Sequence, residues 1–192
     1  MIKKLAFYDF DSTLVDSPMP ETGKEQWSQH YDIPYPHIGW WGRAESLDLN
    51  VFDIKIYENI VSLARKDIQD SNTRTYVLTS RMEKLRPQLE AVLSSIGLHF
   101  DEVILKKDNR SKGVVVLHEI AKHPDVIRVD VYDDNYEREI ISYKSIIGDI
   151  PEGVQFNIFH VSDGKLNLIK ERYNVQNIIQ EEIERFVYEL KR

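Results

Sequence analysis

Residues 2–14 read IKKLAFYDFDSTL, and this stretch decides the fold of the chain. Residues 2–8 form a short, largely apolar run, which predicts a strand buried inside a sheet. Asp9 and Asp11 follow it directly. Two carboxylates one residue apart can take different tasks, one attacking as a nucleophile and the other moving a proton. The alternative is that Asp11 or Ser12 caps a turn.

The rest of the chain alternates between β-rich runs and amphipathic helical patterns. Strands are expected at 75–78, 103–105, 126–132 and 154–161, and helices near 54–68, 86–96, 111–123, 136–147 and 175–190. This alternation predicts an α/β fold, with a mainly parallel sheet covered by helices on both faces. Sites in such folds lie beyond the carboxyl ends of the strands, so we expect functional residues directly after the apolar runs.

Two of these strand ends carry polar residues that suit phosphate chemistry. Thr79, Ser80 and Arg81 follow the second run, where hydroxyl and backbone N–H groups suit an oxyanion or phosphate. Ordinary helix capping, which Ser80 fits better than Thr79, is the alternative. Asp133 and Asp134 follow the fourth run, and adjacent carboxylates there suit Mg²⁺. The alternative is a capped turn before the next helix.

A basic cluster stands out in an otherwise acidic chain. Its members are Lys106, Lys107, Arg110 and Lys112. Lys112 lies at the expected start of a helix, near the carboxyl edge of the sheet, where an ammonium could neutralise an anionic substrate and an attacking carboxylate. Lys106 and Lys107 compete for this role, and most of the cluster is expected to be a solvated loop.

Composition excludes several other classes of protein. The chain has 192 residues, 32 acidic and 25 basic side chains, a formal net charge of −7 and no cysteine. Disulfides, thiolate nucleophiles and cysteine-ligated metals are therefore excluded. Neither a signal peptide nor an apolar stretch of membrane-spanning length is present, so we expect a cytoplasmic protein without a membrane partner. The length predicts a single domain over 1–192.

Residues 16–50 differ in kind from the rest. Four of the seven prolines and all three tryptophans lie there, and prolines at this density oppose long regular elements. The aromatic residues indicate an ordered, cap-like insertion. They could stack on bases or form the insertion's own small core, and for most of them the second reading is preferred.

Four segments together resemble the motifs of the haloacid dehalogenase (HAD) superfamily. They are KLAFYDFDSTL, VLTSR, Lys112 and VDVYDDN. Within the insertion, Ser17-Pro18-Met19-Pro20, Trp27 and Gly39-Trp40-Trp41 resemble the Swiss Army Knife RNA repair-like branch of that superfamily. The fourth strand departs from the HAD pattern, since Arg128, Asp130 and Tyr132 alternate there with apolar residues.

The resemblance implies a Rossmann-like three-layer core and a Mg²⁺-dependent phosphohydrolase. Asp9 is expected to form an aspartyl-phosphate, while Asp11 acts as acid and then as base. Thr79 and Lys112 are expected to hold phosphate oxygens. The expected metal ligands are Asp9, Asp11 through its backbone carbonyl, Asp133 and its neighbour Asp134. The expected substrate-binding residues are Ser12, Thr13, Ser80, Arg81, Trp40 and Trp41.

The expected substrate is a phosphorylated nucleotide or polynucleotide end, as in RNA or DNA repair. Two alternatives remain open. One is a phosphatase of the same chemistry that acts on mononucleotides or small metabolites. The other is a module that binds a phosphorylated partner without catalysis.

Overall fold

A central strand of five residues organises the molecule, whose computed structural model describes residues 1–172. This strand, β1, pairs in parallel with β4 on one side and with β6 on the other. β5 extends the sheet beyond β4, and β7 extends it beyond β6, again in parallel, whereas β8 returns antiparallel on β7. The six strands, in the order β5-β4-β1-β6-β7-β8, are Glu102–Lys106, Thr73–Met82, Lys4–Tyr8, Arg128–Asp133, Gln155–Ser162 and Lys165–Arg172.

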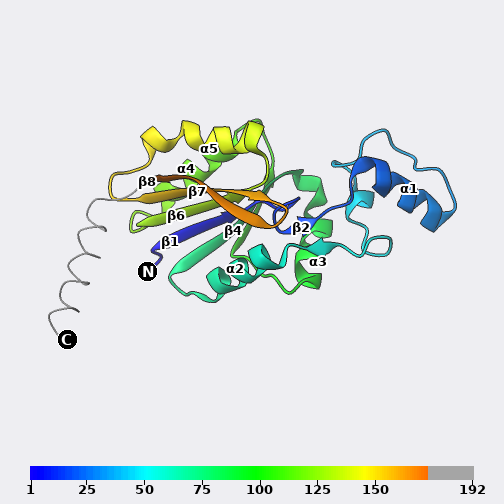
Figure 1. Cartoon of the computed structure of the whole chain (residues 1–192), viewed down its shortest axis with the longest axis horizontal. Coiled ribbons are helices and arrows are strands. Elements are labelled where there is room, and N and C mark those ends of the chain that lie inside the picture. Colours follow the sequence, from blue (N-terminus) through cyan, green and yellow to red (C-terminus); the bar gives the residue numbers. More distant parts are fainter. Residues whose placement is uncertain (173–192) are drawn as a thin grey trace.

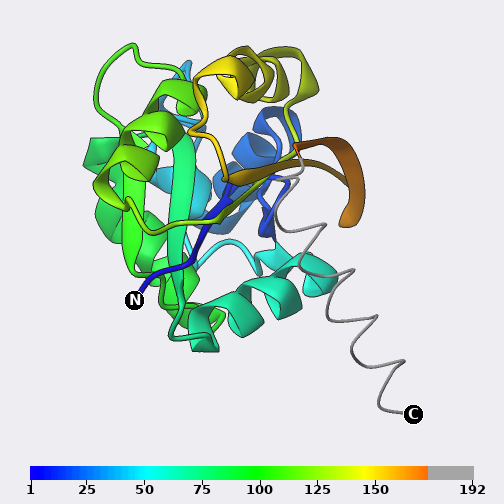
Figure 2. The ribbon, with the colours of Figure 1, turned by 90° about the vertical axis from the view of Figure 1, so that its left-hand side faces the viewer.

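Helices cover both faces of this sheet (Figure 1). Leu5 and Phe7 of β1 point into a core with α4 (Lys112–Lys122) and α5 (Ile141–Ser145). Ala6 and Tyr8 point to the opposite face, where α2 (Glu58–Gln69) and α3 (Arg86–Ser95) pack. The turned view separates the two layers on either side of the strands (Figure 2). The three-layer α/β fold predicted from the sequence is therefore confirmed.

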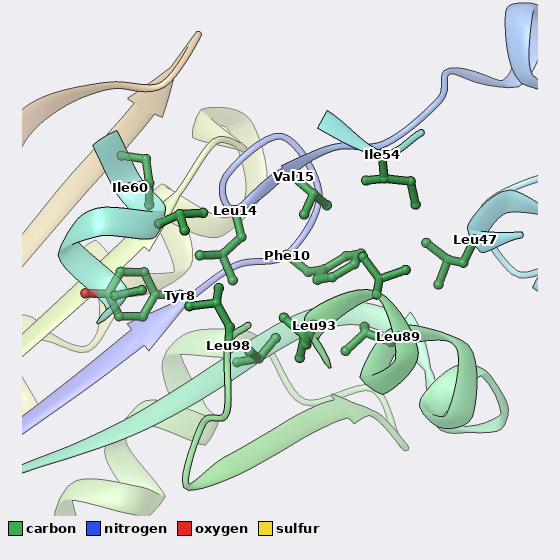
Figure 3. Close-up of a cluster of buried hydrophobic side chains, with 14 of the residues drawn as sticks. Tyr8, Phe10, Leu14, Val15, Leu47, Ile54, Ile60, Leu89, Leu93 and Leu98 are labelled. Atoms are coloured by element: carbon green, nitrogen blue, oxygen red, sulfur yellow. The ribbon is translucent and has the colours of Figure 1, made fainter. Parts of the chain in front are cut away.

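Phe10 anchors the turn that follows β1. Its side chain is fully buried among apolar residues from the turn, from α3 and from the following segments (Figure 3). Its carbonyl accepts hydrogen bonds from the backbone N–H groups of Leu14 and Val15, both at 3.1 Å. Ser12, inside the turn, has a φ of 56°. Burial of Phe10 thus fixes the backbone between the two carboxylates of Asp9 and Asp11.

The segment 16–50 is largely folded, and its helix α1 (Pro20–Tyr31) lies far from the sheet (Figure 1). The expectation that its prolines oppose long elements was wrong for this helix, because Pro20 occupies the first turn, where no N–H donor is needed. The segment also contains a 3₁₀ turn, Ala44–Leu47, and is framed by the short antiparallel strands β2 (Val15–Asp16) and β3 (Lys55–Ile56).

Trp40 forms the centre of the packing inside this segment. Its side chain is buried, and its indole N–H donates to the carbonyl of Pro18 at 2.7 Å. A Cβ at Gly23 would collide with the Trp40 ring, so α1 can approach it only with glycine there. Trp27 is also buried in the segment. These two aromatic side chains therefore have a packing role, as the preferred interpretation expected, but their core is continuous with the one on the α2 and α3 face of the sheet.

Several predicted element boundaries agree with the structure. α3 begins at Arg86, and Gly97 follows it with a φ of 69°. Ser111 caps α4, its hydroxyl accepting from the N–H of Val114. No helix within residues 1–172 combines the length and hydropathy needed to cross a membrane. The helix expected at 175–190 lies outside the described residues.

Other boundaries differ from the expectation. β4 continues through Thr79, Ser80 and Arg81 to Met82, so these residues belong to a strand and not to a turn. A bulge between Leu78 and Met82 interrupts the regular pairing of β4 with β5. The helix expected at 136–147 is a π-helical turn, Tyr136–Ile140, followed by the short α5. β8 was not predicted, and two of its apolar residues, Leu166 and Leu168, are exposed.

The charged residues of β6 lie in a buried network. Asp130 is fully buried, and its carboxylate lies 3.0 Å from the ammonium of Lys4. The amide of Asn157 and the guanidinium of Arg128 also donate to it. Burial opposes the charged form of Asp130, but Lys4 and Arg128 outweigh it, so the pKa of Asp130 is lowered. A central strand can carry this aspartate because every oxygen is neutralised.

Replacing Lys4→Met should remove that neutralisation. Since Lys4 also pairs with Asp67 at 2.9 Å, Asp67 would lose its ammonium and Asp130 would keep Arg128 as its cation, and we expect the free energy of unfolding to fall by about 3 kcal/mol at pH 7. A carboxylate whose pKa is lowered in the folded state stabilises the protein at pH values above its unfolded-state pKa. This stabilisation is lost as the pH falls through the folded-state pKa. The difference from wild type should therefore shrink below about pH 4. Urea unfolding at both pH values measures it.

Lys3→Met is the matched control, because within residues 1–172 the Lys3 ammonium contacts a single backbone carbonyl, that of Asp125, at 3.4 Å. Equal destabilisation by the two variants, or a loss that does not depend on pH, would contradict the role given to Lys4.

Candidate functional site

A cavity of about 510 Å³ opens at the carboxyl ends of β1, β4 and β6. In α/β folds, binding sites lie in the crevice outside the carboxyl ends of the strands, as this cavity does. Residues of the β1 turn, the end of β4, the start of α4 and the segment after β6 line it, and residues of 16–50 cover one side. The predicted site residues among its lining are Asp9, Asp11, Ser12, Trp41, Thr79, Ser80, Arg81, Lys112, Asp133 and Asp134.

The ammonium of Lys112 joins two of these strand ends. It donates to Oδ1 of Asp9 at 2.6 Å and to Oδ2 of Asp133 at 2.7 Å. All three side chains are buried, and Tyr143 donates its hydroxyl to Asp133 at 3.1 Å. Burial disfavours the charge of Lys112, but the carboxylates of Asp133 and Asp9 outweigh it and raise its pKa.

Close helix packing fixes where this lysine stands. Gly113, the next residue, donates its backbone N–H to the hydroxyl of Ser142 at 2.9 Å. A Cβ at position 113 would collide with the backbone carbonyl of Ser142. The first turn of α4 therefore lies directly against α5, and this contact sets the height of Lys112 above the strand ends.

Three carboxylates lie close together here, and two of them, Asp9 and Asp133, contact the ammonium of Lys112. Oxygen atoms of Asp9, Asp133 and Asp134 all lie within 4.8 Å of one another. Burial, more than any neighbouring charge, raises the pKa of Asp9 well above its usual range. Burial and the charge of Asp133 raise the pKa of Asp134 to about 6. A set of hard oxygen donors that resists ionisation in this way fits a divalent cation such as Mg²⁺.

Asp11 faces a different partner. Its two oxygens accept from Nε and Nη2 of Arg81 at 2.8 and 2.7 Å. Its carboxylate is therefore not part of the acidic cluster, and only its backbone carbonyl remains as the predicted metal ligand. The two acidic residues of the Asp-x-Asp pair are thus held apart by different cations.

Arg81 differs from the expectation of a substrate contact. Its side chain is 2% exposed, and Nη1 donates to Ser46 Oγ at 2.7 Å and to the carbonyl of Trp41 at 3.2 Å. Its guanidinium therefore links Asp11 to the insertion. Thr79 lies beside it, with its hydroxyl accepting from the Arg81 N–H at 3.1 Å.

Thr13 and Trp40 require correction as predicted substrate contacts. Thr13 is fully buried beneath the turn, and Trp40 is 3% exposed within the insertion. Neither lines the cavity. Trp41, the neighbour of Trp40, is 38% exposed and does line the cavity, with the guanidinium of Arg81 over its ring at 5.3 Å from the ring centroid.

Two residues at the cavity rim were missed by the sequence analysis. Arg138 and Glu139 contact each other and Ser80 at the end of β4. Their sequence signal was their position in the first turn after the Asp133-Asp134 strand end, at the carboxyl edge of the sheet. The competing lysines, Lys106 and Lys107, are exposed and line a neighbouring hollow.

Comparison with known families gives this site its context. Residues 32–184 match the model of HAD domain family 1 in Swiss Army Knife RNA repair proteins. The chain belongs to this family. The resemblance found in the sequence motifs is therefore confirmed, and the protein is placed among the HAD-superfamily hydrolases. Among curated proteins, no sequence matches the chain.

Solved structures support the same fold for this HAD domain. A haloacid dehalogenase-like hydrolase from Streptococcus pneumoniae is similar over 81% of this chain and 83% of its own, with a TM-score of 0.52 and 14% identity. The HAD domain of the effector Lem4 from Legionella pneumophila is similar over 94% and 93%, at 0.50 and 14%. A chain of a Pnkp1/Rnl/Hen1 complex is similar over 83% of this chain and 46% of its own, at 0.50 and 12%.

The Lys112→Met variant should have a lower free energy of unfolding than wild type, because it leaves the acidic cluster without its ammonium. Without the ammonium, Asp9 and Asp133 are buried and unpaired, so we expect a loss of about 3 kcal/mol in the free energy of unfolding when EDTA is present. Millimolar Mg²⁺ should restore part of this loss, because cation binding stabilises the folded state. Thermal and urea unfolding with EDTA or Mg²⁺ measure both effects.

Lys107→Met, at an exposed lysine whose nearest carboxylate is 3.9 Å away, is the control. If Lys112→Met unfolded like wild type in EDTA, or if Mg²⁺ stabilised neither protein, the cluster would not need a cation.

Proposed function

We propose that this HAD domain is a Mg²⁺-dependent phosphohydrolase that acts through an aspartyl-phosphate on Asp9. The observation that supports it most is the position of Asp9. Its carboxylate lies at the floor of the cavity, bound to Lys112 and close to two further carboxylates that suit a divalent cation. An oxygen nucleophile beside a fixed cation is what phosphoryl transfer to a carboxylate requires.

In the first step, an oxygen of Asp9 attacks phosphorus. The bond from phosphorus to the leaving oxygen breaks with its electron pair on that oxygen, and Asp11 supplies the proton. In the second step, water attacks phosphorus, its proton passes to Asp11, and Asp9 is released as a carboxylate. Both oxygens of Asp11 accept from Arg81 in the structure, so in this proposal the pair opens before Asp11 carries the proton.

Other groups of the cavity balance the charge of the transferred phosphoryl group. In this proposal the hydroxyl of Thr79 and the ammonium of Lys112, which both line the cavity, contact its oxygens. Asp9, the carbonyl of Asp11, Asp133 and Asp134 would hold Mg²⁺, which when bound supplies positive charge to phosphoryl oxygens and to the nucleophile. In such chemistry the protein mainly positions groups and stabilises charge.

We further propose that the substrate is a phosphorylated nucleotide or polynucleotide end. The family model carries the name of RNA repair proteins, and the cavity volume is within the range of small-molecule sites. Trp41 exposes its ring at the opening, with Met19 and Met82 also lining the cavity. An exposed aromatic face next to apolar side chains suits stacking on a base. In this proposal the segment 16–50 acts as a small cap.

The Asp9→Asn variant should lose phosphate release by roughly 10³-fold or more, because an amide cannot attack phosphorus at a useful rate. The assay is Mg²⁺-dependent release of inorganic phosphate from 3′- and 5′-phosphorylated oligonucleotides, mononucleotides and glycerol phosphate. Normal turnover by Asp9→Asn would contradict the proposal that Asp9 is the nucleophile. No turnover by wild type on any substrate would favour a phosphate-binding module, and preference for mononucleotides would favour the metabolic alternative.

Trp41→Ala tests the base contact. Stacking contributes roughly 1–3 kcal/mol per base, so KM for nucleotide substrates should rise about fivefold or more. KM for glycerol phosphate should stay within about twofold, because that substrate has no base. Tyr31→Ala is the control, since Tyr31 is a similarly exposed aromatic residue of the insertion that does not line the cavity. A rise in KM for every substrate, or for none, would exclude stacking on Trp41.

A further inference from the structure

Arg138 stands between two hollows. It lines the cavity described above and also a second hollow of about 430 Å³ that runs beside β5 and α4. Its side chain is 65% exposed, so most of the guanidinium faces solvent at the rim. None of the steps proposed for the phosphoryl group uses it.

The guanidinium is nevertheless fixed in place. Nε donates to Oε1 of Glu139 at 2.6 Å, and Nη2 donates to Oγ of Ser80 at 3.1 Å. Ser80 in turn donates to the same oxygen of Glu139 at 3.1 Å, and Glu139 is 4% exposed. A guanidinium carries five N–H groups, so about three remain without a hydrogen-bond partner among residues 1–172. One edge is anchored to a buried carboxylate, and the other edge faces outward.

The other cations of the cavity are already engaged. Lys112 is bound to Asp9 and Asp133 and is 6% exposed. The guanidinium of Arg81 donates hydrogen bonds to Asp11 and to Ser46 in the segment 16–50. Within the described part of the chain, Arg138 is therefore the cavity cation that presents N–H donors to solvent. A held planar fork of this kind is suited to a phosphate with two oxygens to offer.

The second hollow continues this positive surface away from Asp9. Its described lining contains seven lysine and arginine residues against four aspartate and glutamate residues. Lys106 and Lys107 are among these lining residues, and both are exposed. An anionic chain that leaves the phosphate site past Arg138 would enter a surface of favourable net charge.

We infer that Arg138 binds a second phosphate of the substrate, next to the phosphate that Asp9 attacks. This inference rests on the proposed function and deepens it. The second phosphate could be the phosphodiester that follows a polynucleotide end or the other phosphomonoester of a nucleoside bisphosphate. The basic hollow beyond Arg138 favours the polynucleotide end, because only a chain continues into it.

The experiment compares wild type with Arg138→Ala and Arg138→Lys on three substrates. They are a mononucleotide, a nucleoside 3′,5′-bisphosphate and a dinucleotide with a terminal phosphate. Arg138→Ala should lower kcat/KM for the dinucleotide roughly tenfold, through KM, and leave the mononucleotide within about twofold. Arg138→Lys should recover part of the loss. Equal losses of kcat/KM on the bisphosphate and the dinucleotide would mean that Arg138 binds either kind of second phosphate. A loss on the dinucleotide alone would mean that Arg138 binds the phosphodiester.

Glu139→Gln and Arg65→Ala complete the set. Glu139→Gln loosens the anchor and should give a smaller loss with the same substrate pattern. Arg65 is a half-exposed arginine on α2, paired with Glu58, and its loss should change nothing. Equal losses on all three substrates, or no loss on any, would overturn the inference while leaving Asp9 chemistry intact.

Binding separates this outcome from failure of the proposed function. Calorimetric titration of Asp9→Asn, with and without Arg138→Ala, measures the affinity for the dinucleotide and the mononucleotide without turnover. If wild type hydrolyses none of the substrates, the proposed function fails. A selective loss of dinucleotide affinity would still support Arg138, and an unchanged affinity would overturn it.

Discussion

One ammonium group holds the site together. Asp9 and Asp133 come from strands that are 124 positions apart in sequence, and both are buried where water cannot stabilise their charge. The free-energy cost of burying a carboxylate is large unless it is paired with a cation, so the fold must hold Lys112 between the two aspartates. The capped start of α4 and its contact with α5 accomplish this. Thr79, Asp11 and the cavity itself are arranged around that three-residue pairing.

Much of the fold and part of the site could be predicted because their signals are local. A buried parallel strand shows as an apolar run, and the residue after it lies at the sheet edge whatever the distant chain does. This is why Asp9, Thr79 and Asp133 were found together from sequence, and why Ser111 indicated the start of α4.

The remainder depends on partners far away in the chain. Nothing near Arg81 indicates that it holds Asp11, 70 residues earlier, and nothing in β6 indicates that Lys4 neutralises Asp130. Trp40 and Trp41 are indistinguishable as letters, yet tertiary packing buries one ring and exposes the other. The extension of β4 through Met82 likewise arises from pairing with β5 across a bulge, which local propensity does not encode.

The contact at Gly113 has a consequence for how this chain can diverge. Any side chain there would strike the Ser142 carbonyl and lift the first turn of α4. Lys112 rises with that turn, so a change that adds one methyl group would act at a distance on the charge balance of Asp9 and Asp133. Tolerance to substitution should therefore be as narrow at a residue without any functional group as at the lysine beside it, and a compensating change would have to come from α5.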